Sequence, residues 1–398
     1  MEWKNESLGN IAFMTSGGTP SSKIPAYYKN GTIPWVRSGE LENGAIRDTE
    51  IKITQAGLDN SSAKIFPKGT LLIALYGATI GKLAYLDIDA CTNQAVCGIF
   101  ENEKISLKYL YYFLLFHRPD LVKQGIGGAQ SNISQTILKK LMVSYPVDIA
   151  EQLRIVARIE ELFSGLDNGV ETLRKTKQQL AVYRQAVISA AFPEMTDANT
   201  VRLDEIAEIT GGITKGRDLS KQKTTHLPYL RVANVQNGYL DLSQVKTIEL
   251  KICEMEKYLL QSGDVLYTEG GDRDKLGRGT VWNDEIPNCV HQNHVFKARL
   301  DRERANPKYV AYWSMSAFAR NYFYNKGKQS VNLASINKTV LSALTLPLPS
   351  LVAQEAVLRE IESRLSVCDE IEKTVDTALQ QAEAMRQSIL KQAFEGGL

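Results

Sequence analysis

Two runs of apolar residues recur at seven-residue intervals, and the second run lies 202 residues after the first. The first contains Ile159, Leu166, Leu173, Leu180 and Val187, and the second contains Ile361, Cys368, Val375, Ala382 and Ile389. A sustained seven-residue repeat among Glu, Lys, Arg and Gln predicts a long helix with one apolar seam, as in a coiled coil. We therefore expect helices over 150–192 and 350–398, with these ten residues at the interface between them. The alternative is an ordinary pair of core helices.

The intermediate positions of the two runs support the same interpretation in part. Apolar side chains recur there at Leu162, Tyr183 and Ala190, and again at Ile371, Ala378 and Met385. Gly165 and Gly169 weaken the first run, because each glycine costs about 1 kcal/mol relative to alanine inside a helix. We therefore expect a kink or a break near these two glycines.

The repeat extends into the segments that precede the helices. Leu8, Ile11, Ala12, Thr15 and Gly17 reappear as Leu203, Ile206, Ala207, Thr210 and Gly212, and Tyr109 and Tyr112 reappear as Tyr309 and Tyr312. Matching order and spacing along the whole chain indicate a tandem duplication of a globular segment followed by a helix.

The globular segments read as mainly β with one helix each, which gives an α+β class. Short apolar runs at Leu71–Tyr76, Val265–Thr268 and Val295–Leu300 are separated by Gly, Asn, Asp and Pro turn signals. Helices are expected at Leu107–Phe116 and Lys308–Phe318. The predicted organisation is a first domain (1–149), a helix (150–192), a polar linker (193–201), a second domain (202–349) and a second helix (350–398).

Composition places few further constraints on the chain. It has 398 residues, a net charge of +2 and 43% hydrophobic residues, values typical of a globular protein with room for two or three domains. The five cysteines lack zinc-ligand or close disulfide spacing, which predicts reduced thiols and a cytoplasmic location. No signal peptide or membrane-spanning run is recognised.

The residue patterns of common catalytic sites are weak or absent. The segment Gly77–Lys82 resembles a phosphate loop, but its spacing is one residue short and no Ser or Thr follows the lysine. A strand–turn–strand with glycines at positive φ explains it better. His291 and His294 could bind a metal, but no supporting ligands lie nearby, and a polar loop explains them better. We predict no metal, no cofactor and no catalysis in this chain alone.

Polar, glycine-rich loops in both halves carry the residue types that contact DNA phosphates and base edges. The predicted DNA-binding residues of the first half are Ser21, Lys23, Tyr27, Arg37, Ser38, Glu40, Lys82, Gln130, Ser131 and Asn132. Those of the second half are Lys215, Arg217, Arg231, Asn234, Arg273, Lys275, Arg278, His291, Gln292, Asn293, His294, Lys326, Lys328 and Gln329. The apolar framework matches between the halves while these loops differ, which favours two unlike recognition surfaces on one scaffold. The alternative is that the loops are merely solvated.

The order of several short motifs resembles the specificity subunits of type I restriction–modification systems. These motifs are Gly17–Ser21, Gly31–Trp35, Gly77–Lys82, Gln130–Asn132, Glu151–Gln152 and Ala190–Phe192, with parallel segments at Gly327–Asn332, Gln354–Glu355 and Gln392–Phe394. The similarity extends over essentially the whole chain. It implies two target-recognition domains, each reading half of a bipartite DNA site, and an antiparallel helix pair that sets the gap.

The same resemblance implies partners that carry the chemistry. Two methyltransferase subunits and two translocase–nuclease subunits would assemble with this chain, and S-adenosylmethionine, ATP and magnesium would belong to them. Two other interpretations remain open from the sequence: a non-catalytic scaffold with two peptide-binding modules, and an enzyme of unrecognised class.

Overall fold

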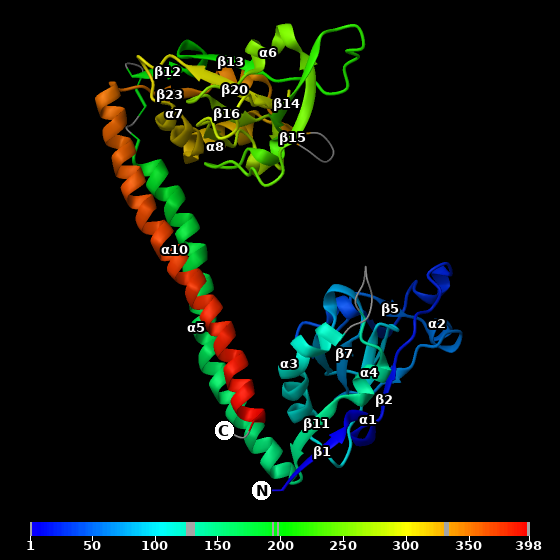
Figure 1. Cartoon of the computed structure of the whole chain (residues 1–398). Coiled ribbons are helices and arrows are strands. Elements are labelled where there is room, and N and C mark those ends of the chain that lie inside the picture. Colours follow the sequence, from blue (N-terminus) through cyan, green and yellow to red (C-terminus); the bar gives the residue numbers. More distant parts are fainter. Residues whose placement is uncertain (1, 125–131, 193–194, 197–198, 330–333, 396–398) are drawn as a thin grey trace. The chain divides into compact units, whose positions relative to one another are not determined.

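The computed structural model describes residues 2–124, 132–192, 195–196, 199–329 and 334–395 (Figure 1). The chain divides into two compact units, unit 1 (Met1–Thr172 with Ala378–Leu398) and unit 2 (Leu173–Thr377). Helices α5 (Ile149–Ala190) and α10 (Leu351–Phe394) each contribute residues to both units. Each unit therefore contains one globular domain and one part of the helix pair.

The central sheet of unit 1 has strands in the order β2-β10-β7-β8-β4. Their bounds are β2 (Met14–Ser16), β4 (Gly44–Ile46), β7 (Leu71–Ala74), β8 (Leu83–Leu86) and β10 (Val96–Ile99). Successive side chains of a strand point to opposite faces, so Leu71 and Ile73 join one apolar cluster while Leu72 and Ala74 join another. All four are buried, which explains why this strand reads as a continuous apolar run.

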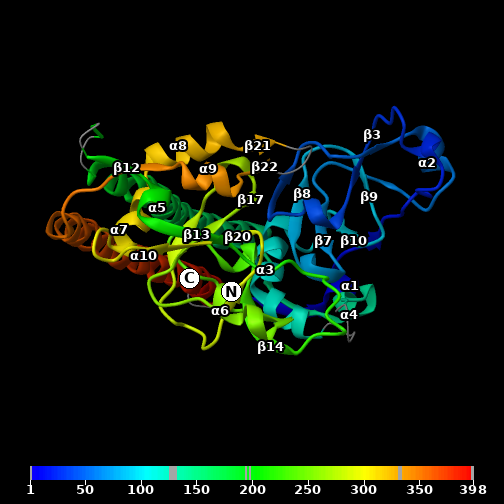
Figure 2. The same ribbon diagram turned by 90° about the horizontal axis from the view of Figure 1, so that it is seen from above.

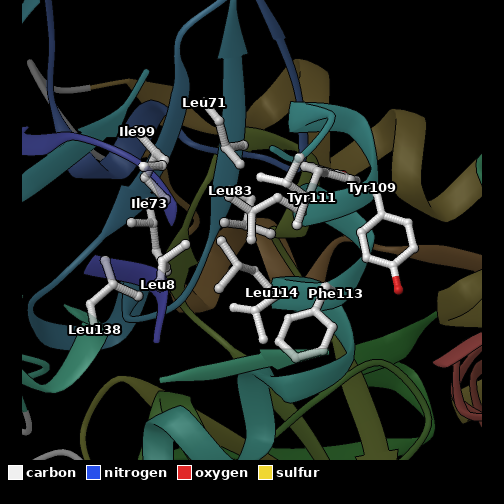
Figure 3. Packing of buried hydrophobic residues seen from close by; sticks show 14 of the residues in the cluster. Leu8, Leu71, Ile73, Leu83, Ile99, Tyr109, Tyr111, Phe113, Leu114 and Leu138 are labelled. Carbon is white, nitrogen blue, oxygen red and sulfur yellow. The ribbon is translucent and has the colours of Figure 1, made fainter. Parts of the chain in front are cut away.

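The larger cluster of unit 1 packs helix α3 (Leu107–Gln124) against this sheet (Figure 3). In Figure 3, Leu114 of α3 lies beside Leu83 of the sheet, while the ring of Tyr109 points away from the sheet. The short helices α1 (Leu8–Ile11) and α4 (Gln135–Lys140) add Leu8 and Leu138 to the same cluster. The sequence predicted the helix only to Phe116. The helix instead continues through Pro119 to Gln124.

A second sheet of unit 1 has the order β5-β3-β9-β6, and β1 pairs with β11. Their bounds are β1 (Trp3–Ser7), β3 (Ile33–Val36), β5 (Lys52–Ile53), β6 (Ile65–Phe66), β9 (Ala90–Thr92) and β11 (Met142–Pro146). In Figure 2, β3, β9 and helix α2 (Gln55–Asp59) lie on the side of the central sheet away from α3.

Unit 2 repeats most of these strand pairings, but the described strands include no counterpart of β4–β8 or β6–β9. Its sheets have the orders β13-β20-β16-β18, β15-β14-β19 and β12-β23. Their bounds are β12 (Thr200–Arg202), β13 (Ala207–Gly211), β14 (Thr224–Leu230), β15 (Lys246–Lys251), β16 (Val265–Thr268), β18 (Gly279–Val281), β19 (Val290–His291), β20 (Val295–Leu300) and β23 (Thr345–Pro347). In both units one parallel pair, β3–β9 or β14–β19, occurs within the second sheet. The α+β class and the tandem duplication are therefore confirmed.

Unit 2 differs from unit 1 in an additional sheet and in its domain helices. An additional sheet has the order β17-β22-β21, with β17 (Gly270–Gly271), β21 (Lys328–Gln329) and β22 (Ala334–Ser335). Two helices, α7 (Pro307–Met315) and α8 (Ala317–Lys326), replace the single α3, because Ser316 is extended and its hydroxyl accepts the Ala319 N–H. Short helices α6 (Met255–Tyr258) and α9 (Lys338–Ser342) complete the unit.

Within each unit, α5 and α10 run antiparallel and are joined by ion pairs. In unit 2, Lys177 contacts Asp376 at 2.7 Å and Arg184 contacts Asp369 at 2.6 Å. Later residues of α5 therefore contact earlier residues of α10, which is the antiparallel arrangement. In unit 1, Arg386 pairs with Asp167. Arg184 and Arg386 are separated by 202 residues, as are Asp167 and Asp369. The ion pair is thus repeated once in each unit.

Eight of the ten predicted seam residues are buried, and Leu166 and Leu173 are half-buried. Besides the seam residues, the interface contains a second row of side chains. These residues follow the seam residues by four positions in the sequence, and not by three. The row includes Phe163 and Ala393, which are buried, and the paired side chains of Lys177, Arg184 and Arg386. At the positions three residues after the seam, the apolar side chains of Tyr183, Ile371 and Met385 are 50%, 39% and 54% exposed, so they do not form this second row. Knobs-into-holes packing stays a prediction.

Helix α5 contains no break at Gly165 or Gly169. A Cβ atom built at either glycine would meet open space, so both positions face outward and the helix passes through them uninterrupted. The predicted break is therefore wrong. Among the helices of the described residues, none is both long and apolar enough to cross a membrane.

Candidate nucleic-acid interface

A tight turn after the central strand occupies equivalent places in the two units. In unit 1 the Ala74 N–H donates to the Lys82 carbonyl at 2.9 Å, and in unit 2 the Thr268 N–H donates to the Arg278 carbonyl at 2.9 Å. The preceding residues, Gly81 and Gly277, have φ of 72° and 65°. Glycine adopts this conformation without the penalty of a Cβ atom. The predicted strand–turn–strand is therefore confirmed, and Lys82 and Arg278 are equivalent basic residues.

A second segment closes against the same turn in each unit. Tyr76 pairs with Asn132 in unit 1, and Gly270 pairs with Ser335 in unit 2. The scaffold thus holds different side chains at equivalent backbone positions. Gln130 and Ser131, which precede Asn132, lie outside the described residues.

Unit 2 gathers basic residues on three neighbouring segments beside this turn. The first segment is the turn η7 (Arg273–Lys275) with the nearby Arg278, the second is the end of α8, and the third is the start of β21. Their basic residues are called the basic cluster below: Arg273, Lys275, Arg278, Lys326 and Lys328. The Arg273 guanidinium lies 4.3 Å from the ring centroid of Tyr324, and its Nε donates to the Tyr324 carbonyl at 3.2 Å. Figure 2 shows β17, β21 and β22 together near α8. Clustered basic side chains attract phosphates.

Unit 1 has one basic residue near its turn that the sequence did not nominate. Arg118 of α3 donates from Nε to the Ile80 carbonyl at 3.3 Å, and its side chain packs over Gly81. The predicted helix ended at Phe116, so Arg118 lay outside every candidate loop. A longer helix prediction would have brought it to the same edge as Lys82.

Other predicted residues of unit 1 lie away from this turn. Ser21 and Lys23 are exposed, Tyr27 is half-buried in the turn η1 (Pro25–Tyr27), and helix α2 packs against this turn. The described contacts do not join these residues to Lys82 or Asn132. In unit 2, Lys215 is exposed and Arg217 is half-buried, with its Nη1 atom 2.8 Å from Glu254.

Four predicted contact residues also form hydrogen bonds within two equivalent turns, η2 (Ser38–Glu40) and η5 (Val232–Asn234). The Arg37 N–H donates to Glu40 at 2.7 Å, and the Arg231 N–H donates to Asn234 at 3.0 Å. Asn234 is only 2% exposed and donates to the carbonyls of Asp241 and Gln244. Because its polar atoms are used inside the protein, the prediction that Asn234 contacts DNA is not supported. Ser38 is half-buried in the first of these turns.

His291 is also an internal residue. It is fully buried at the end of β19, and its Nδ1 lies 2.6 Å from the Val295 carbonyl. Burial lowers the pKa of its imidazole to about 4. The same strand register places Thr92 at this position in unit 1. Its neighbours Gln292 and Asn293 are half-buried and His294 is exposed, so among these four residues only His291 is internal.

Glycines in the opening motif of each half have a packing reason. A Cβ atom on Gly17 would lie 2.0 Å from the Thr92 carbonyl oxygen, and one on Gly212 would lie 2.1 Å from that of His291. Only glycine permits these close approaches. The shared Gly17 and Gly212 therefore report on the scaffold and not on recognition.

A family model described as the type I restriction modification DNA specificity domain matches residues 1–180 and again residues 195–381. The chain belongs to this family. The two matches correspond to the two halves of the duplication, so each half is one specificity domain with most of its helix.

Curated relatives and solved structures agree with this membership. The type I restriction enzyme StySPI specificity subunit of Salmonella potsdam is 27% identical over 418 residues, covering 100% of this chain and 89% of the relative. The EcoKI specificity subunit of Escherichia coli K12 is 25% identical, covering 94% and 84%. A chain from a study of complex assembly in a type I restriction–modification system has a TM-score of 0.74 at 17% identity, covering 100% of this chain and 98% of its own. The HsdS subunit of Thermoanaerobacter tengcongensis has a TM-score of 0.51, covering 100% and 97%.

Each specificity domain also has a groove where it meets the start of a long helix. In unit 1 a groove of about 540 Å³ is lined by Gly69, Ser106, Lys108 and Leu153, among others. In unit 2 a groove of about 430 Å³ is lined by the equivalent residues Gly263, Asn306, Lys308 and Glu355. Lys108 contacts Glu160 at 3.2 Å and Lys308 contacts Glu362 at 2.7 Å, so the same ion pair borders both grooves.

The described residues contain no group of three or more His, Cys, Asp or Glu side chains that could hold a metal ion. His294 lies 2.6 Å from Glu269 at the edge of unit 2, and this pair has no third ligand.

Proposed function

We propose that this chain is the DNA-recognition subunit of a type I restriction–modification complex, in which each specificity domain reads one half of a bipartite, asymmetric site. The observation that carries this proposal is the duplicated turn. It keeps a basic residue in both units, Lys82 and Arg278, but holds Tyr76 and Asn132 in one and Gly270 and Ser335 in the other. Basic residues bind phosphates of any sequence, whereas differing side chains at equivalent positions suit different bases.

The long helices would set the gap between the half-sites. Helix α5 contains 42 residues and α10 contains 44. At 1.5 Å per residue, a helix of this length spans about 60 Å. An antiparallel pair with ion pairs in each unit supports the role of a spacer of fixed length.

The duplicated grooves support docking of two copies of the same partner, which we identify as two methyltransferase subunits. A surface repeated in both halves, including the Lys108–Glu160 and Lys308–Glu362 pairs, suits a partner that binds twice. Two translocase–nuclease subunits would join for cleavage. S-adenosylmethionine, ATP and magnesium would be bound by the partners, and this chain would catalyse no step itself.

We also propose that the complex works in the cytoplasm. The five cysteines of the chain are free, and four of them are buried. Cysteines that persist as free thiols suit a reducing compartment.

The competing function is a scaffold with two peptide-binding modules, and salt dependence separates the two. The chain, co-purified with its methyltransferase subunits, is titrated with a mixed-sequence DNA duplex at several salt concentrations. For a DNA-binding protein, the logarithm of the binding constant falls steeply and linearly with the logarithm of the salt concentration, because binding neutralises phosphates and releases their counterions. A scaffold for peptides shows no measurable duplex binding even at 50 mM salt, and that result would refute the proposal.

A further inference from the structure

The two units differ sharply at one pair of equivalent positions beside the turn. In unit 1 the Leu75 N–H donates to the Ala95 carbonyl at 2.8 Å, and in unit 2 the Glu269 N–H donates to the His294 carbonyl at 2.9 Å. The next backbone bond is also shared, because the carbonyls of residues 75 and 269 accept the N–H groups of Ile133 and Ile336, each at 2.8 Å. The backbone is thus the same, while an apolar pair in one unit is replaced by a charged pair in the other.

The scaffold does not need this charged pair. Leu75 and Ala95 are 1% and 9% exposed and complete the same backbone arrangement without any polar side chain. In unit 2 the His294 Nδ1 lies 2.6 Å from the Glu269 Oε2, and the side chains are 54% and 27% exposed. Placing a carboxylate in a half-buried position costs desolvation energy. A role outside folding is therefore the simplest reason for it.

The surroundings of this pair indicate which ligand it meets. Glu269 directly precedes β17, which contacts both η7 and β22, and the basic cluster of Arg273, Lys275, Arg278, Lys326 and Lys328 lies on these and adjoining segments. Lys275 pairs with Asp272 beside the same turn, and the other basic side chains of the cluster suit the DNA backbone. A carboxylate at the edge of the cluster opposes phosphate binding, so its contribution is not to overall affinity. Carboxylates and imidazoles at such surfaces contribute instead to the reading of base edges.

Glu269 and Asn293 fix the orientation of the His294 ring. A carboxylate only accepts hydrogen bonds, so the proton that lies between the two groups, 2.6 Å apart, is on Nδ1. Nε2 is then an acceptor, and the Asn293 Nδ2 lies 3.4 Å from it, near the long limit of a hydrogen bond. In the major groove the purine adenine offers its amino group as a donor next to N7 as an acceptor. Nε2 and the Asn293 amide together match that edge.

Building on the proposed DNA-recognition function, we propose that His294, with Asn293, contacts a purine edge in the half-site read by unit 2. Glu269 is the positioning residue that orients the imidazole. Unit 1 has no counterpart of this device among its described residues, because Leu75 and Ala95 occupy the equivalent positions. The pair therefore makes the two domains unlike in what they recognise.

The repeat supplies a variant that the scaffold tolerates. In Glu269→Leu/His294→Ala, unit 2 carries the residues that unit 1 holds at the same backbone positions. Glu269→Gln keeps the size of the side chain and removes its charge. Arg202→Ala/Asp204→Ala is a matched control, since it removes another ion pair of unit 2, at 2.7 Å, on strand β12 and the adjoining turn.

The test is selection from random-sequence DNA by the full chain in complex with its methyltransferase subunits. The Glu269→Leu/His294→Ala complex is expected to lose about 5- to 100-fold of the preference for a purine at one position, in one half-site only. Glu269→Gln is expected to lose part of that preference, and the control variant none. Unchanged preferences in the double variant, or a uniform loss of affinity for all sequences, would overturn the inference. A wild-type complex that enriches no split motif would overturn the proposed function and this inference with it.

Discussion

Gln152 and Gln354, which are 202 residues apart, make the same hydrogen bonds in the two units. Each is fully buried in the first turn of its long helix. The Gln152 amide donates to the carbonyls of Lys104 and Pro146 and accepts the Ser106 N–H, while Gln354 does the same with Arg304, Pro349 and Asn306. One side chain thus ties the loop before the domain helix to the start of the long helix, so it fixes how each helix leaves its own domain.

Gln152→Ala and Gln354→Ala are each expected to destabilise their own unit by about 2–4 kcal/mol. Each substitution removes three hydrogen bonds and leaves buried carbonyl and N–H groups unsatisfied. Chemical denaturation measures the loss, and Gln178→Ala, an exposed glutamine of the same helix, is the control. Equal stability of Gln152→Ala and Gln178→Ala would contradict this role.

The helix interface is expected to depend on its apolar seam far more than on its ion pairs. Ile361 is fully buried against Ile188 and Met315, so Ile361→Ala should cost about 2–5 kcal/mol. The Asp369 side chain is 69% exposed in its pair with Arg184, so Asp369→Ala should cost less than about 1 kcal/mol. Urea denaturation measures the free energy of unfolding that each variant loses. A larger loss in Asp369→Ala than in Ile361→Ala would refute the prediction that the apolar seam matters more.

Acid is expected to destabilise unit 2 through His291. Its pKa is about 4 in the folded chain and about 6.5 when unfolded, so the unfolded state binds the proton first as pH falls. As far as His291 is concerned, the free energy of unfolding is therefore highest above pH 6.5. It decreases by up to about 3 kcal/mol toward pH 4. His291→Thr, which introduces the residue of unit 1, should remove this part of the pH dependence. The free energies of unfolding of the wild type and of His291→Thr, measured from pH 7 to pH 4, test this prediction. The same change with pH in both proteins would exclude it.

Charge reversal at the grooves is expected to remove one methyltransferase subunit at a time. Lys108→Glu and Lys308→Glu place a second carboxylate beside Glu160 or Glu362 and reverse the charge of one groove. Native mass spectrometry of co-expressed complexes should record one bound methyltransferase for each single variant and none for the double variant. Lys215→Glu, which lies in neither groove, is the control. Two bound copies in every variant would place the docking surface elsewhere.

A matched deletion in both helices is expected to shorten the tolerated gap in the DNA site. Residues 180–186 face 367–373 in the register of Arg184 with Asp369, and removing both preserves the seven-residue repeat. Seven residues correspond to about 10 Å of helix, or about 3 base pairs. The gap preferred in DNA selection reports the change, and an unaltered gap would argue against the helices as a spacer.

Much of the fold could be predicted because it depends on local patterns. The strands at Val265–Thr268 and Val295–Leu300 have the predicted bounds, since short runs rich in apolar residues between turn signals identify strands. The second row of the helix interface could not be predicted. Apolar residues such as Tyr183 occur three positions after the seam, and the positions four residues after it include charged Arg184, which reads as a surface residue until its partner Asp369 is known.

The sequence could predict which residue types form the candidate site, but it could not predict which of those residues are buried. Lys82 and Arg278 were nominated from their loops and prove to be equivalent. Asn234 and His291 have the same polar character, and only tertiary contacts reveal that their atoms are used internally. Glu269 was missed because an isolated glutamate after a strand carries no signal. Its significance depends on His294 and on the comparison with Leu75.

The most direct test of the central claim is selection from random-sequence DNA by the wild-type chain in complex with its methyltransferase subunits. Two unlike specificity domains on a spacer of fixed length predict a split, asymmetric motif with one gap length. Replacing residues 1–149 with another specificity domain should then change one half of that motif and leave the other. A folded complex that enriches no motif at low salt, or a replacement that alters both halves, would contradict the account.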